Sequence, residues 1–178
     1  ETSASLNINE DGTASLIAGV VDVTGGGRAA LSMMVAEELG IPVERVRVLP
    51  SDTSSLGFNF MTAGSRGTAA GGMAAVKCAR DAITRMIDVA AKKWGVKPEQ
   101  VVWEDGHARP AGANVGDFKP LSVADIAREA AWYGGTIAGH AEINVIGQGP
   151  GLGTHICDVE VDRETGAVKV LRYTIIQD

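Results

Sequence analysis

The sequence predicts an α+β fold, in which mixed sheets built from β-hairpins have helices packed on one side. Two observations indicate this. Segments that alternate apolar and polar residues occur in pairs joined by short turns. Between them lie long segments with apolar residues three and four positions apart, the spacing of an amphipathic helix. With 178 residues, we expect a single α+β unit over 1–178 with candidate sub-lobes at 1–95 and 96–178.

The first half of the chain begins with alternating segments. Residues 3–9 and 13–18 alternate on either side of Glu10-Asp11-Gly12, which predicts a β-hairpin. A helical period starts at Arg28 and ends at Gly40, which is followed by Pro42. Residues 46–49 then form a strand. Residues 50–61 have no period, so we expect a long loop.

The second half contains two more helices and five strands. One helix ends at Gly95, and we expect its apolar stripe to form core: Val76, Ala79, Ile83, Met86, Ile87, Ala90 and Trp94. Residues 101–104 and 107–110 form a hairpin around Asp105-Gly106. Ser122, with Asp125 three positions later, begins a helix that ends near Tyr133. Residues 137–145 form a strand, 146–153 a connection, and 155–161 with 168–176 a final hairpin.

Composition excludes several partners. The formal net charge is −6 and the chain has no basic run, which argues against a nucleic-acid interface. No apolar segment is long enough to span a bilayer, so we expect no membrane partner and a cytoplasmic location. Cys78 and Cys157 form neither a CxxC motif nor a disulfide framework, and we interpret both as buried free thiols.

The segment Thr62 to Met73, TAGSRGTAAGGM, joins the long loop to the longest helix. Small side chains let backbone N–H groups approach a ligand, and a helix N-terminus favours negative charge, so the segment suits a phosphate. Arg66 is its only charged residue and would add charge-assisted hydrogen bonds. Tight packing of the helix start against a strand explains the same glycines equally well.

A second glycine cluster, residues 24–28, lies between a strand and a helix. It fits the loose form G-x-G-x-x-A of a dinucleotide-binding unit, but the preceding strand is the second arm of a hairpin and therefore has an antiparallel neighbour. We favour two converging anion-binding loops that hold one extended phosphorylated ligand. The candidate binding residues are Thr24, Gly25, Gly26, Gly27, Arg28, Thr62, Gly64, Ser65, Arg66, Gly67 and Thr68.

Other candidates are weaker. His107, His140 and His155 are too scattered for a metal site. Asp22 and Asp52 are placed where aspartates commonly cap loops, so we favour a structural role for both. A hydrolase centred on Ser65 is a minor option, because the segment matches a nucleophile elbow only in part. We assign no catalytic residue and no metal ligand.

The run AGVVDVTGGGRAALSMMVAEELGIPVERVRVLPSDT, followed by TAGSRGTAAGG, resembles the molybdopterin-binding large subunit of the xanthine dehydrogenase and aldehyde oxidase family of molybdenum hydroxylases. The resemblance covers residues 3 to about 90 and resumes at 154–177. It implies a fragment of the cofactor-binding domain of an oxidoreductase that hydroxylates an aldehyde or an N-heterocycle with oxygen from water. The competing interpretation is a stand-alone phosphate- or nucleotide-binding domain without catalytic activity.

The resemblance also implies cofactors and partners. These are a molybdenum-pterin cofactor, as a cytosine dinucleotide in many bacterial members, the remainder of the large subunit, and iron–sulfur clusters and FAD on other subunits or domains. Family loops matching 23–28 and 62–68 embrace the cofactor, although Gly25 replaces the usual Gln. The family's catalytic Glu lies downstream of strands like 168–176, so we expect no activity from this chain alone. The exposed edge of that strand predicts a homo-oligomer.

Overall fold

The computed structural model describes residues 1–23, 25–50, 54, 57–64, 66–144 and 153–177, which form an α+β fold as predicted. The chain divides into two compact units, 1–147 and 148–178. The division at residue 95 stays a prediction. The elements of the first unit are β1 (Thr2–Ile8), β2 (Ala14–Ala18), α1 (Gly27–Leu39), η1 (Val43–Arg45), β3 (Val46–Pro50), α2 (Arg66–Trp94), η2 (Pro98–Gln100), β4 (Val101–Glu104), β5 (His107–Pro110), β6 (Leu121–Ser122), α3 (Val123–Tyr133) and β7 (Ala138–Ile143).

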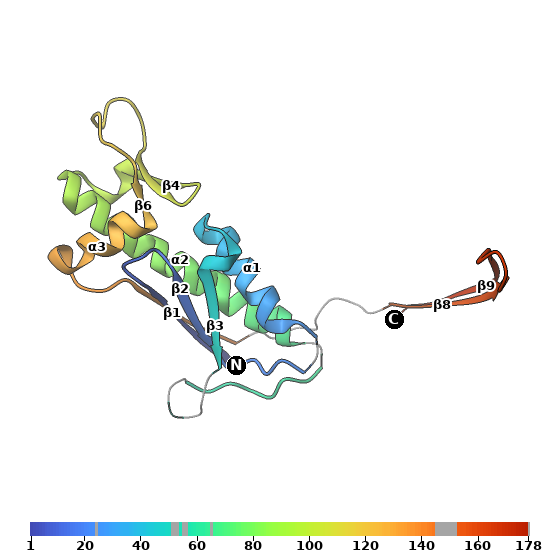
Figure 1. Ribbon diagram of the computed structural model, residues 1–178. Coiled ribbons are helices and arrows are strands. Elements are labelled where there is room, and N and C mark those ends of the chain that lie inside the picture. The colour runs from blue at the N-terminus through green and yellow to red at the C-terminus, as the bar shows by residue number, and fades with distance from the viewer. Residues whose placement is uncertain (24, 51–53, 55–56, 65, 145–152, 178) are drawn as a thin grey trace. The chain divides into compact units, whose positions relative to one another are not determined.

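A four-stranded sheet with the strand order β3-β2-β1-β7 forms the base of the first unit (Figure 1). The predicted hairpin is confirmed, because β1 and β2 pair antiparallel with Leu6 opposite Leu16. On its other side β2 pairs in parallel with β3, and α1 connects these two strands. The antiparallel neighbour that we used against a dinucleotide-binding unit is therefore only one of the two neighbours of β2.

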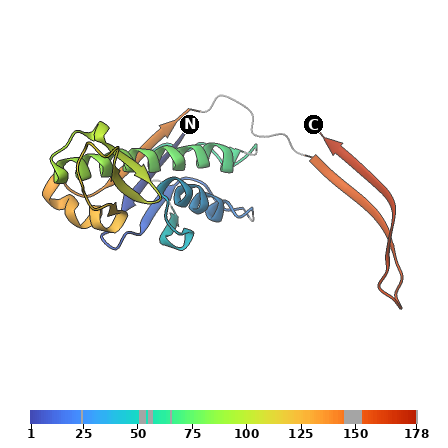
Figure 2. The same ribbon diagram turned by 90° about the horizontal axis from the view of Figure 1, so that it is seen from above.

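Helices cover one face of this sheet, as predicted. The side chains of Ala4, Leu6, Ala14 and Leu16 are buried on that face, while Asn7 on the opposite face is exposed. α1 and α2 lie side by side along the sheet, and both begin at the same end (Figures 1 and 2). The hydrophobic effect therefore holds a two-layer structure whose outer sheet face is polar.

The apolar stripe predicted for α2 is only partly correct. Ala79, Met86 and Ala90 are fully buried, whereas Val76, Ile83, Ile87 and Trp94 are half-buried. The fully buried positions are mostly small, and include Ala74, Ala75, Cys78 and Ala82. A Cβ atom added to Gly139 of β7 would lie 2.0 Å from the carbonyl oxygen of Cys78. Small residues on both elements thus let the backbones of helix and sheet approach closely.

A smaller sheet, β4-β5-β6, lies at the far end of α2. The predicted hairpin is confirmed, with Asp105 (φ 47°) and Gly106 (φ 71°) in its turn. Gly106 touches the end of α1, where the Cβ positions of Gly40 and Gly106 are both blocked by the other's backbone. The predicted start of α3 is also confirmed, because Ser122 Oγ accepts a hydrogen bond from the N–H of Asp125 at 3.2 Å.

The second unit is a β-hairpin of β8 (Gly153–Val161) and β9 (Val168–Gln177), as predicted. One of its faces is polar and includes the ion pair between Asp158 and Arg172 at 2.7 Å. The other face is apolar, and among the described residues of this unit nothing covers it. Its side chains include Cys157, Val159, Val161, Val168, Val170 and Tyr173. Cys157 is exposed, so the expectation that both thiols are buried was wrong for this residue.

Candidate cofactor site

The two glycine-rich segments meet at one point of the first unit. The N–H of Val21 donates a hydrogen bond to Thr62 Oγ1 at 3.2 Å. The side chain of Val20 contacts glycines of both segments, since a Cβ on Gly27, Gly67 or Gly71 would lie 3.8, 3.6 or 2.5 Å from it. The first turns of α1 and α2 are thereby held next to each other (Figure 2).

The first loop is occupied in part by a carboxylate of the protein itself. The Asp22 carboxylate accepts hydrogen bonds from the N–H groups of Gly26 at 3.2 Å and Arg28 at 3.4 Å. This confirms the structural role expected for Asp22, which caps the start of α1 in the way that such carboxylates stabilise helix N-termini. Two backbone donors that we had considered for a ligand are therefore engaged by the protein itself.

The first loop still has open space and a positively charged side chain for an anionic ligand. A Cβ on Gly25 or Gly26 would meet no atom within 4 Å, and Gly26 has a φ of 70°, which favours glycine. The side chain of Arg28 is exposed and has no hydrogen-bond or ion-pair partner within the described part of the chain. Because a guanidinium matches phosphate geometry, Arg28 is available to an anionic ligand.

The second loop offers backbone donors. Gly64 has a φ of 60° and open space at its Cβ position. In the first turn of α2, the N–H of Arg66 donates to the carbonyl of Ala63 at 3.3 Å. The N–H groups of Gly67 and Thr68 meet no acceptor in the ranges that the structure describes. Backbone donors at a helix start, together with the helix dipole, favour a bound anion.

Arg66 lies differently from the expectation. Its guanidinium is half-buried and donates to four protein acceptors, two through each terminal nitrogen. Nη1 donates to the carbonyls of Phe60 at 2.8 Å and Met61 at 3.1 Å. Nη2 donates to the carbonyl of Glu1 at 3.1 Å and to Thr2 Oγ1 at 2.7 Å. The arginine that we expected to contact a phosphate thus binds the loop itself.

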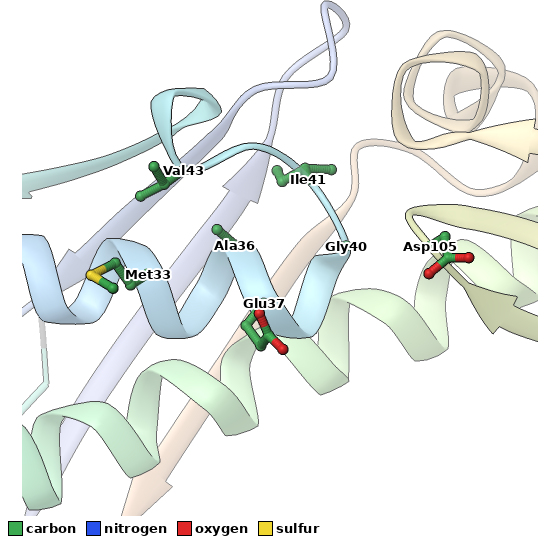
Figure 3. A pocket seen from close by; sticks show the side chains of 7 residues that line it. All are labelled: Met33, Ala36, Glu37, Gly40, Ile41, Val43 and Asp105. Atoms are coloured by element: carbon green, nitrogen blue, oxygen red, sulfur yellow. The ribbon is translucent and has the colours of Figure 1, made fainter.

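Two cavities are bounded by described residues, one at this site and one away from it. A cavity of about 10 Å³, bounded in part by Val20, Thr62 and Arg66, has room for no more than one water molecule. A hollow of about 460 Å³ lies instead near the C-terminal end of α1 and includes the acidic Glu37 and Asp105 (Figure 3). The carboxylates of Glu37 and Asp105 disfavour a phosphate in this hollow. At the two loops the Asp22 carboxylate is engaged by the N–H groups of Gly26 and Arg28, so we keep the open surface there as the candidate site.

Three residues of the sequence-based argument, Thr24, Asp52 and Ser65, lie outside the described residues. Sequence reasoning also missed residues that shape the site, namely Val20, Asn59 and Gly71. Gly71 had a signal, because it belongs to the glycine-rich segment; its need for glycine follows from Val20, which leaves no room for a side chain there. Within the described ranges, no group of three or more His, Cys, Asp or Glu residues could hold a metal ion.

The family model of the molybdopterin cofactor-binding domain matches residues 1–178. The chain belongs to this family. The domain is 29% identical to the carbon monoxide dehydrogenase large chain of Hydrogenophaga pseudoflava and 26% identical to the nicotine 6-hydroxylase large subunit of Paenarthrobacter nicotinovorans. Each match covers 99% of this chain and 22% of the relative, so the domain spans about a fifth of these proteins.

Solved structures share the fold of this domain. The CO dehydrogenase of Oligotropha carboxidovorans matches with a TM-score of 0.78, over 99% of this chain and 22% of that chain. The quinoline 2-oxidoreductase of Pseudomonas putida 86 matches with a TM-score of 0.67, over 99% and 23%. Both are 21% identical to this chain.

The residues present fit an anionic cofactor of this family. The surface at the two loops has open space beside Gly25, Gly26 and Gly64, and the exposed Arg28 and the backbone of Gly67 and Thr68 belong to the same two segments. Such a surface can hold phosphate groups or the polar edge of a ring system without a side chain in the way. Separately, no helix of the described residues has the length and apolar character needed to cross a bilayer.

Proposed function

We propose that this domain holds one side of the molybdopterin cofactor in the large subunit of a molybdenum hydroxylase, an oxidoreductase that hydroxylates an aldehyde or an N-heterocycle with oxygen from water. The observation that carries the proposal is the convergence of the two glycine-rich loops, because Val20 and Val21 hold both helix starts at one open surface. Membership of the cofactor-binding family supports it. The stand-alone phosphate-binding alternative is not favoured.

Each group at the surface has a definite task in this proposal. Gly25, Gly26 and Gly64 let the cofactor approach the backbone. The N–H groups of Gly67 and Thr68 donate to its phosphate oxygens, and Arg28 adds a positive charge. Thr24, Ser65 and Gly27 belong to the same two segments and complete the binding set. When bound, the cofactor supplies the redox centre, and the residues of this domain position it.

We further propose the finer features implied by the family resemblance. The cofactor is in the cytosine dinucleotide form, and electrons leave through iron–sulfur clusters and FAD on partner subunits or domains. The remainder of the large subunit covers the open side of the site. The assembled enzyme is a cytoplasmic homo-oligomer. In this proposal the 178 residues alone do not form a complete cofactor site, and they turn over no aldehyde, purine or N-heterocycle.

The test compares two glycines that both have open Cβ positions, Gly25 at the site and Gly112 in a loop next to β5. Gly25→Leu and Gly112→Leu are made in the large subunit that contains this domain. Molybdenum is then counted by elemental analysis, pterin by fluorescence after oxidation, and released cytidine nucleotide by chromatography. We expect molybdenum, pterin and cytidine nucleotide in equal amounts in the parent protein and in Gly112→Leu.

In Gly25→Leu we expect at least a tenfold loss of molybdenum and pterin, because the leucine fills space that the cofactor needs. The melting temperature of the cofactor-free protein should be the same in both variants, since a Cβ atom at either position meets no atom within 4 Å. Full cofactor content in Gly25→Leu would refute the assignment of the site. Molybdenum with pterin but without cytidine nucleotide would refute only the dinucleotide form.

A further inference from the structure

The contacts of Arg66 account for nearly all of its hydrogen-bonding capacity. A guanidinium has five N–H donors, and the four on Nη1 and Nη2 are engaged by Phe60, Met61, Glu1 and Thr2. The guanidinium carbon also lies 5.4 Å from the centre of the Phe60 ring, a cation–π distance. A phosphate could bind the two terminal nitrogens only by displacing these acceptors.

The same loop is tied to β1 by a second set of polar contacts. The N–H of Phe60 donates to the carbonyl of Glu1 at 3.1 Å. Asn59 accepts from the N–H of Ser3 at 3.2 Å and donates to Ser3 Oγ at 3.1 Å. Arg66 and Asn59 therefore fasten residues 59–62 to the start of β1, directly before the second glycine loop. Thr62, at the end of this stretch, accepts the hydrogen bond from Val21.

We infer that Arg66 is a positioning residue: its guanidinium holds residues 59–62 against β1 and so aligns Thr62 with the first glycine loop, while Arg28 is the cation that meets the anionic ligand. This inference rests on the proposed function for the ligand, but the clamp itself rests only on the contacts within the chain. It reverses the sequence-based assignment, in which Arg66 contacts a phosphate. A positive charge alone cannot perform this role, because the planar guanidinium donates in several fixed directions to four separate acceptors.

The variant that separates the two roles of Arg66 is Arg66→Lys, which keeps the positive charge but loses the planar guanidinium. We compare it with Arg66→Ala, Arg28→Lys and Arg28→Ala in the full 178-residue chain. The first measurement is amide hydrogen exchange at Phe60, whose N–H donates to Glu1, and at Val21, whose N–H donates to Thr62 at the end of the clamped stretch. We expect Arg66→Lys and Arg66→Ala to exchange at least tenfold faster at both amides, and both Arg28 variants to match the wild type.

The second measurement is binding of inorganic pyrophosphate at several salt concentrations, followed by amide chemical shifts. We expect Arg28→Ala to bind more weakly and with a smaller dependence on salt, because a charge that contacts the ligand is lost. Arg28→Lys should keep most of that dependence. Arg66→Lys should bind more weakly while its salt dependence stays that of the wild type, which a direct phosphate contact would change.

Wild-type exchange rates at Val21 and Phe60 in Arg66→Lys would overturn the inference. A salt dependence that falls in the Arg66 variants but not in Arg28→Ala would overturn it as well. If the wild-type chain does not bind pyrophosphate, the role of Arg28 in ligand binding is overturned. The exchange data still decide the clamp, and the cofactor content of Gly25→Leu in the large subunit decides the proposed function. If the Arg66 variants do not fold, Thr2→Val removes one acceptor of the Arg66 guanidinium, because valine resembles threonine in shape but has no hydroxyl group. Faster exchange at Phe60 in this variant supports the clamp, and unchanged exchange overturns it.

Discussion

Gly139→Ala should be among the most damaging single-methyl additions in this domain. The new Cβ would lie 2.0 Å from the Cys78 carbonyl oxygen and 3.0 Å from the Ala82 backbone nitrogen. A carbon and a carbonyl oxygen in contact sit about 3.3 Å or more apart, so α2 and β7 must separate by roughly 1.3 Å. Neither obstacle is a side chain that could rotate away.

The expected cost follows from this separation. Overpacking a core costs about 1–3 kcal/mol where side chains can adjust, and here only backbone can move, so we expect about 3 kcal/mol. A gap of 0.5–1 Å already removes a quarter to a half of each dispersion contact that it widens. For a unit of about 150 residues, a loss of 3 kcal/mol lowers the melting temperature by about 6–12 °C.

The assay is urea denaturation followed by tryptophan fluorescence. Trp94, Trp103 and Trp132 all belong to the first unit, so the signal reports on that unit and not on the β8–β9 hairpin. Gly112→Ala is the control, because its Cβ meets no atom within 4 Å, and it should change stability by less than about 0.5 kcal/mol. A Gly139→Ala midpoint equal to that of the wild type would refute the close approach of helix and sheet.

Two further predictions concern titrating groups. Burial raises the pKa of the Cys78 thiol to about 12, whereas Cys157 is exposed, so a thiol reagent at pH 8 should label one cysteine in the native protein and two in urea; two rapidly labelled native thiols would contradict this. Hydrogen bonds from Ser122 lower the pKa of Asp125 below its ordinary value of 3.8. The stabilisation by this carboxylate is therefore complete above pH 3.8 and is lost as the pH falls through the lower folded-state pKa. Thermal melts of wild type and Ser122→Ala should differ by about 1 kcal/mol at pH 7. The difference should narrow as Asp125 is protonated, leaving the part due to the hydrogen bond from the Asp125 N–H to Ser122 Oγ, and a difference that does not change with pH would exclude a contribution from the carboxylate.

Local signals predicted the elements of the fold well. The Ser122–Asp125 capping box and the Asp105-Gly106 turn each depend on a few adjacent residues, and the structure has both where the sequence indicated. The buried side of α2 was harder to predict. Its identity depends on how closely the sheet approaches, which Gly139 sets from 61 positions beyond Cys78. A hydrophobicity pattern weights large apolar residues and so misplaces a stripe of alanines.

The candidate site shows the same division between local and distant information. The two glycine segments were visible in the sequence because glycine clusters at helix starts are locally distinctive. The roles of the two arginines were not, since Arg66 takes its partners partly from the first two residues of the chain. Whether a guanidinium faces a ligand or a carbonyl is decided by this long-range placement. Sequence spacing carries no information about it.

The contact between Gly40 and Gly106 has a consequence for comparing related sequences. Each glycine has a positive φ, and the Cβ position of each is blocked by the other's backbone, at 2.3 Å for Gly40 and 2.5 Å for Gly106. A substitution at one cannot be offset by a change at the other, because glycine has no smaller replacement. We therefore expect both positions to be glycine throughout related sequences. Invariant positions cannot covary, so contact maps inferred from coupled substitutions would miss the contact between the β4–β5 hairpin and the end of α1.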